Sequence, residues 1–78
     1  MFTQLEECVS RLIREGHQLL YSRTVISEDG EMSLRTVFVR DKNNGIEIWQ
    51  SFLVDEKETV SRVYLSKQEI QALKLLLH

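Results

Sequence analysis

The stretch from Met32 to Val54, MSLRTVFVRDKNNGIEIWQSFLV, decides the fold. Two runs rich in β-branched and aromatic residues, Met32–Arg40 and Ile46–Val54, lie on either side of Asp41–Gly45. Asn and Gly between two such runs are typical of a β-hairpin, because these residues accept the backbone angles that a tight turn requires. We therefore expect two antiparallel strands joined by a short turn.

The same pattern continues on both sides of this hairpin. Upstream, Leu19–Ser27 is a third β-rich run, and Glu28–Glu31 forms the turn that joins it to the hairpin. Downstream, the acidic and exposed segment Asp55–Glu58 leads into a last strand at about Thr59–Leu65. Short connections of this kind favour pairing between consecutive strands, so the sequence predicts a four-stranded antiparallel meander.

The segment before the sheet has the pattern of an amphipathic helix. Thr3 and Glu6 have the spacing of a capping box, and Gly16 suits a position just past the helix end. The apolar period also continues to Leu20, so a longer helix is the alternative. The apolar side of this helix comprises Phe2, Leu5, Val9, Leu12 and Ile13.

The last segment carries a second capping box, Ser66 with Glu69, and Leu65 and Ile70 have the spacing of a hydrophobic staple. The apolar side of this closing helix comprises Ile70, Leu73, Leu76 and Leu77. The expected order is therefore αββββα. We expect residues 1–78 to form a single α+β domain, with helices flanking the sheet at both ends of the chain.

Composition indicates an ordinary globular domain. Hydrophobic residues make up 42% and charged residues 28% of the chain, which argues against disorder. The net charge of -2 gives the whole molecule no attraction for nucleic acid or an anionic membrane. Cys8 is the only cysteine, which excludes an intramolecular disulfide and fits a cytoplasmic protein. No apolar run is long enough to span a bilayer, so no membrane association is expected.

The sequence lacks the signatures of common enzymes. It contains no G-x-S-x-G, no P-loop and no dinucleotide-binding glycine pattern. Cys8 and His17 flank the same helix without an evident acid to orient the histidine, and a buried apolar thiol is the simpler interpretation of Cys8. We therefore expect a non-enzymatic binding module with no catalytic residue, metal, cofactor or small-molecule substrate.

Both faces of the predicted sheet are apolar. Two helices could cover one face each, or a second copy of the chain could cover one of them, and we expect a homodimer. One predicted face comprises Val37, Val39, Ile46, Ile48, Phe52, Val63 and Leu65. The other comprises Leu34, Phe38, Trp49, Leu53, Val60 and Tyr64, mixed with Arg40, Glu47 and Arg62.

Aromatic and basic residues alternate along the strands. Rings on a sheet can stack on bases while nearby cations contact phosphates, so this mixture suggests a surface for single-stranded nucleic acid. The alternative, which composition alone favours, places the rings in the core or a dimer interface and the arginines at solvated edges. The candidate nucleic-acid-binding residues are Arg35, Phe38, Arg40, Trp49, Arg62 and Tyr64.

From Met32 to Leu77 the chain resembles the PC4-like family of transcriptional coactivators that bind single-stranded nucleic acid. The resemblance rests on IEIW at residues 46–49 and VYLSKQEI at residues 63–70. It implies a homodimer packed through the C-terminal helices, with sheet channels that bind single-stranded DNA or RNA through Arg40, Trp49 and Arg62. The chain differs from the family's usual pattern in having Trp49 in place of a basic residue.

A protein-interaction module, such as an inhibitor or adaptor of the kind found in mobile elements, is the alternative function. Its basis is the surplus apolar sheet face together with an acidic loop that could meet a basic partner. The candidate residues of this loop are Asp55, Glu56 and Glu58.

Overall fold

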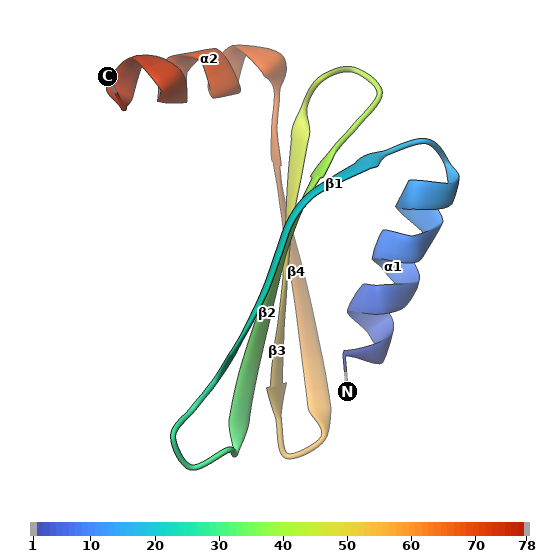
Figure 1. The fold of residues 1–78 in the computed structure, drawn as a ribbon, viewed down its shortest axis with the longest axis vertical. Coiled ribbons are helices and arrows are strands. Elements are labelled where there is room, and N and C mark those ends of the chain that lie inside the picture. The colour runs from blue at the N-terminus through green and yellow to red at the C-terminus, as the bar shows by residue number, and fades with distance from the viewer. Residues whose placement is uncertain (1, 78) are drawn as a thin grey trace.

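The structure, a computed structural model, describes residues 2–77. The strands form one antiparallel sheet in the order β1-β2-β3-β4 (Figure 1), which confirms the predicted α+β meander. The elements are helix α1 (Thr3–Arg14), strands β1 (Gln18–Ile26), β2 (Met32–Arg40), β3 (Ile46–Val54) and β4 (Lys57–Leu65), and helix α2 (Lys67–Leu76).

The two helices lie differently relative to the sheet. Helix α1 lies along one face, whereas α2 leaves the end of β4 and projects away on the other side (Figure 1). Among the described residues, the fully buried apolar ones are Leu5 of α1 with Val37 and Val39 of β2, so the core lies between α1 and the sheet. We call the side covered by α1 the α1 face and the opposite side the open face.

The register corrects the predicted division of the two faces. Residues paired across an antiparallel ladder point to the same side of the sheet. Val37 pairs with Trp49 and Val39 with Glu47, so these four residues share the α1 face. The prediction that grouped Val37 and Val39 with residues 46 and 48 is therefore wrong, because both of the latter pair with even-numbered residues of β2 and lie on the open face.

The predicted N-terminal capping box is also wrong. Helix α1 begins at Thr3 with Phe2 as the N-cap, and no side chain of the helix start caps it. The free amides are satisfied from the sheet instead: Gln4 N–H donates to Glu58 Oε1 at 2.8 Å, and Leu5 N–H donates to Glu58 Oε2 at 3.1 Å. A carboxylate of β4 therefore both caps α1 and ties it to the sheet.

The other helix ends follow the sequence more closely. Gly16 has φ +101°, the left-handed backbone expected just past a helix, and β1 begins at Gln18, so the longer helix to Leu20 is not formed. At α2 the second capping box is confirmed: Ser66 N–H donates to Glu69 Oε1, and Glu69 N–H donates to Ser66 Oγ.

The acidic connection before β4 is shorter than predicted. Asp55 and Glu56 both have positive φ, 50° and 66°, and form a two-residue hairpin turn. Strand β4 consequently starts at Lys57, two residues earlier than the expected Thr59. This places Glu58 in the strand on the α1 face, where it reaches α1.

Candidate interaction surface

The open face carries apolar side chains from all four strands, on both sides of a polar row that crosses the middle of the sheet. Its apolar residues are Tyr21, Val25, Met32, Leu34, Phe38, Ile46, Ile48, Phe52, Val54, Val63 and Leu65, as the register places them. The rings of Tyr21 and Phe38 lie 5.2 Å apart between centroids, so side chains on this face already pack against one another. The face has the composition of one half of a protein core.

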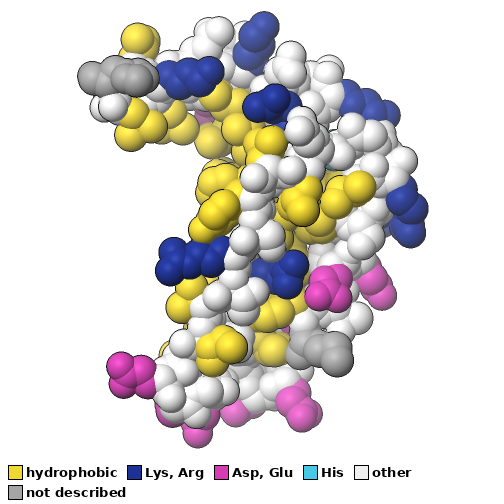
Figure 2. Space-filling view, in the orientation of Figure 1, with side chains coloured by type: hydrophobic (Ala, Val, Ile, Leu, Met, Phe, Trp, Pro, Cys, Tyr) yellow, Lys and Arg dark blue, Asp and Glu magenta, His cyan; other side chains and the backbone are white. Residues whose placement is uncertain are grey.

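Much of this surface is exposed to solvent. Val63 is 55% exposed, Tyr21 44% and Phe52 42%, although β-strand cores bury such side chains almost completely. Figure 2 shows the apolar side chains gathered in a hollow beneath the projecting helix α2. No element among residues 2–77 covers the face.

Helix α2 extends the apolar surface instead of closing it. Leu75, Leu76 and Leu77 are each about 80% exposed. At the base of the helix, a hollow of about 310 Å³ is lined by apolar Ile46 and Ile70. Three cations, Arg40, Lys67 and Lys74, and the amides Asn44 and Gln71 complete its lining.

The charges on the open face are all positive. The strand residues that point to this side, all of which the structure describes, include Arg23, Arg40 and Lys57 but no Asp or Glu. The carboxylates of the strands, Glu47 and Glu58, both lie on the α1 face. A chain of net charge -2 therefore presents a locally basic and apolar surface.

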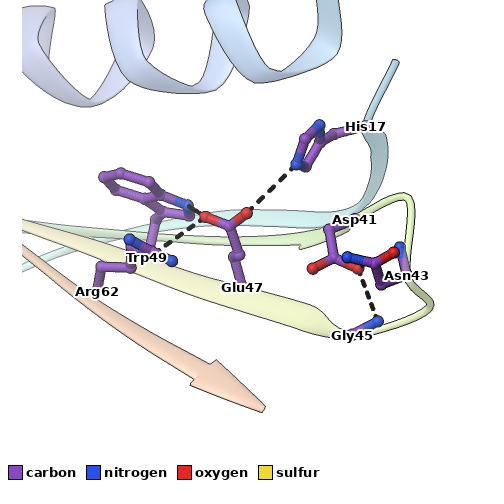
Figure 3. Close-up of polar contacts among 7 residues, drawn as sticks. All are labelled: His17, Asp41, Asn43, Gly45, Glu47, Trp49 and Arg62. Atoms are coloured by element: carbon purple, nitrogen blue, oxygen red, sulfur yellow. Dashed lines mark hydrogen bonds and ion pairs between the residues drawn. The ribbon is translucent and has the colours of Figure 1, made fainter. Parts of the chain in front are cut away.

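The α1 face carries a polar network centred on Glu47, which is 6% exposed (Figure 3). Arg62 Nε lies 3.1 Å from Glu47 Oε1, His17 Nε2 lies 3.4 Å from Oε2, and Trp49 Nε1–H donates to Oε1 at 3.2 Å. The Arg62 guanidinium also lies 5.7 Å from the Trp49 ring centroid. The network satisfies a buried carboxylate, as such a group requires.

The structure divides the predicted nucleic-acid-binding residues between the two faces. Phe38 and Arg40 lie on the open face, and the other four lie on the α1 face. Trp49 packs against the core beneath α1, and Arg62 is paired with Glu47. The six residues therefore do not form one surface.

The remaining two predicted residues, Arg35 and Tyr64, have different surroundings on the α1 face. Arg35 lines a cavity of about 240 Å³ between α1 and strands β1 and β2, and its buried Nε has no hydrogen-bond partner there. The Tyr64 hydroxyl donates a hydrogen bond to Asp41, which raises the pKa of Tyr64 above its ordinary value. The ring of Tyr64 packs over Gly45, where a Cβ would collide with the tyrosine hydroxyl and ring.

The predicted acidic site is likewise divided. Asp55 and Glu56 occupy the exposed hairpin turn, whereas Glu58 is engaged by α1 and by Ser51, whose Oγ donates to Glu58 Oε2 at 2.5 Å. Only the first two are accessible to a partner. Apart from Phe38 and Arg40, sequence reasoning left the open-face residues out of the site, chiefly Tyr21, Ile48 and Val63, although apolar side chains recur at alternate positions along their strands.

Among residues 2–77, no group of three or more His, Cys, Asp or Glu is placed to hold a metal ion, and no helix is both long and apolar enough to cross a membrane. Cys8 is half-buried on α1, and His17 is directed to Glu47. No protein-family model, curated protein or solved structure matches the chain.

Proposed function

We propose that the chain is a small non-enzymatic protein-interaction module whose working surface is the open face together with α2. One observation carries the proposal: a four-stranded sheet face with two rows of mainly apolar side chains lies uncovered beside a helix whose own leucines are exposed. Apolar surface of this extent is costly to keep in water and marks an interaction site. Aliphatic side chains such as Ile48 and Val63 suit protein packing, which is why a protein partner is favoured.

The dimensions of the surface agree with a protein interface. Nine-residue strands are about 30 Å long and four paired strands are about 19 Å wide, which gives roughly 570 Å² for the open face. Helix α2, about 15 Å long and 10 Å wide, adds about 150 Å². The sum approaches the roughly 800 Å² that each partner contributes to a stable interface.

Thiol protection tests the proposal. In a Cys8→Ser background, Ser61→Cys places a single thiol on the exposed part of the open face, and Glu7→Cys places one on the outer side of α1 as a matched control. If a partner occupies the open face nine-tenths of the time, a membrane-permeant maleimide applied to cells should label residue 61 about tenfold more slowly than residue 7. Equal labelling rates would contradict the proposal.

Single-stranded nucleic acid is the second candidate ligand. The observation that favours it is the absence of carboxylates from the open-face strand residues, where Tyr21, Phe38 and Phe52 lie among Arg23 and Arg40. Rings stack on bases and cations contact phosphates in such sites. This proposal keeps the predicted ligand but moves it to other residues, since Trp49 and Arg62 are engaged beneath α1.

Salt dependence tests the second candidate. With three phosphate contacts, from Arg23, Arg40 and Lys57, affinity for a single strand should fall about 20-fold between 50 and 200 mM salt. Fluorescence anisotropy of a labelled oligonucleotide measures this, and Arg40→Ala should reduce the slope while Arg14→Ala, on α1, should not. Binding that is absent at 50 mM salt would reject nucleic acid as the ligand.

A further inference from the structure

We propose that the occupant of the open face is a second copy of this chain. The two sheets pack face to face, and the strands of one copy run antiparallel to the same strands of the other. This inference rests on the proposed function and names its partner. Three observations support it: the shortage of core, the arrangement of polar and apolar rows on the face, and the separation of charge along the sheet.

The single chain has little core of its own. Among the described residues, the fully buried apolar side chains are Leu5, Val37 and Val39, all between α1 and the sheet. A domain of 78 residues buries a small share of its surface and commonly gains stability by association. Two sheets packed through their open faces, about 10 Å apart, would create a second core from residues already arranged as one.

The rows of the open face make it complementary to itself. One polar row crosses the middle of the sheet, and within it Gln50 Nε2 donates to Thr36 Oγ1 at 3.2 Å. An apolar row lies on each side, so a twofold axis through the polar row places each apolar row on the partner's apolar row. The polar row is Arg23, Thr36, Gln50 and Ser61. One flanking row is Tyr21, Phe38, Ile48 and Val63; the other is apolar at Val25, Leu34 and Phe52 and ends at β4 in the polar Thr59.

Charge separation decides the relative direction of the two copies. The β1–β2 and β3–β4 turns lie at the same end of the sheet (Figure 1), and Figure 2 shows acidic side chains at that end and basic ones near α2. The turn end carries Glu28, Asp29, Glu31, Asp55 and Glu56 beside Lys57. The α2 end carries Arg40, Lys42, Lys67 and Lys74 beside Asp41 and Glu69.

The two acids of the α2 end are already engaged within their own chain. Asp41 Oδ1 accepts hydrogen bonds from the backbone of Asn43 and Gly45, and the Glu69 carboxylate belongs to the α2 capping box. The antiparallel arrangement therefore places each basic α2 end over the partner's acidic turns. A parallel arrangement would bring like charges together at both ends, which disfavours association.

Sedimentation of the purified full chain between 1 and 200 µM tests the inference. We expect a species of twice the 9.2 kDa chain mass. Reversing the basic end with Lys67→Glu and Lys74→Glu, or the acidic end with Glu28→Lys and Glu31→Lys, should each weaken the dimer about tenfold. Arg11→Glu with Arg14→Glu, the same charge change on α1, should leave the dimer constant unchanged.

A variant that combines Lys67→Glu, Lys74→Glu, Glu28→Lys and Glu31→Lys tests the relative direction of the two copies. In the antiparallel dimer the two reversed ends meet across the interface, so their effects should not add, and the combined variant should dimerise more tightly than the sum of the two separate losses predicts. In a parallel dimer each end faces its own copy, so the two effects would add, and an additive result overturns the antiparallel arrangement. A chain that stays monomeric at 200 µM while residue 61 is protected in cells overturns the second copy and leaves the proposed function standing. A monomer with residue 61 unprotected overturns both.

Discussion

Replacing Ile48 by aspartate is expected to weaken self-association at least about 1,000-fold. Ile48 lies in the central strand β3, paired with Phe38 and Val63 in one apolar row of the open face. In the face-to-face dimer an aspartate at this position would be buried between two sheets without a partner cation. A buried unpaired carboxylate costs several kcal/mol, and 4 kcal/mol corresponds to about 1,000-fold in the dissociation constant.

Sedimentation equilibrium measures this effect, and urea unfolding provides a second readout. The wild-type midpoint should rise with protein concentration because folding and association are linked, whereas the Ile48→Asp midpoint should not. Ile13→Asp places the same charge on a half-exposed apolar position of α1 and should leave association unchanged. Ile48→Val, which removes one methylene, should have a small effect. A dissociation constant for Ile48→Asp within threefold of the wild type would exclude the open face as the dimer interface.

The sequence predicted the elements well because each carries local signals. Strands β2 and β3 alternate apolar and polar residues on either side of a turn that contains Asn44 and Gly45, and the α2 start has a complete capping box. These signals act over four or five residues, so a reading of neighbouring residues recovers them. The meander then follows from short connections.

Local signals could not show which side chains of each strand lie on which face of the sheet. Val37 with Val39, and Ile46 with Ile48, each resemble core positions, and the register alone shows that they point to opposite sides. In most sheets one face is polar, and the polar residues show which alternate side chains of each strand point to solvent. A shift of one residue would expose every apolar side chain, so the assignment is unambiguous. Here both faces are apolar, so this signal is absent and the candidate ligand-binding residues were placed together incorrectly.

Polar contacts between residues far apart in the sequence could not be predicted from local patterns either. Asp55 and Glu56 form a hairpin turn with positive φ although neither is Gly or Asn, so the turn was not recognised and Glu58 was assigned to an exposed loop. Glu58 instead meets the amides of α1 more than 50 residues earlier in the chain. The network around Glu47 likewise joins residues of β3 and β4 to His17 in the connection between α1 and β1.

Glu58→Ala is expected to lower the free energy of unfolding by about 2–4 kcal/mol at pH 7. The substitution removes the acceptor of two α1 amides, a loss that costs about 1 kcal/mol at a helix start. It also leaves the Ser51 hydroxyl, which is fully buried, without its acceptor, which costs a further 1–3 kcal/mol. Urea unfolding at fixed protein concentration measures the change.

A matched set of variants separates these contributions. Ser51→Ala removes the buried hydroxyl, so the Glu58→Ala loss should be smaller in that background, and the difference gives the coupling between the two side chains. Glu56→Gln, in the exposed turn, should change stability by less than about 0.5 kcal/mol. If Glu58→Ala proved as mild as Glu56→Gln, α1 would not depend on the carboxylate that contacts its first turn.

The stabilisation by Glu58 should also depend on pH in a defined direction. Desolvation raises the pKa of this carboxyl, but the hydrogen bonds that it accepts outweigh that effect and hold the pKa below its ordinary value of 4.5. A lowered pKa in the folded state means that the stabilisation is complete above about pH 4.5 and is lost as the pH falls through the folded-state value. Glu58→Gln lacks this titration, so its difference from the wild type should shrink below pH 4.5. A difference that stays constant down to pH 3 would show that the charge of Glu58 does not hold α1 to the sheet.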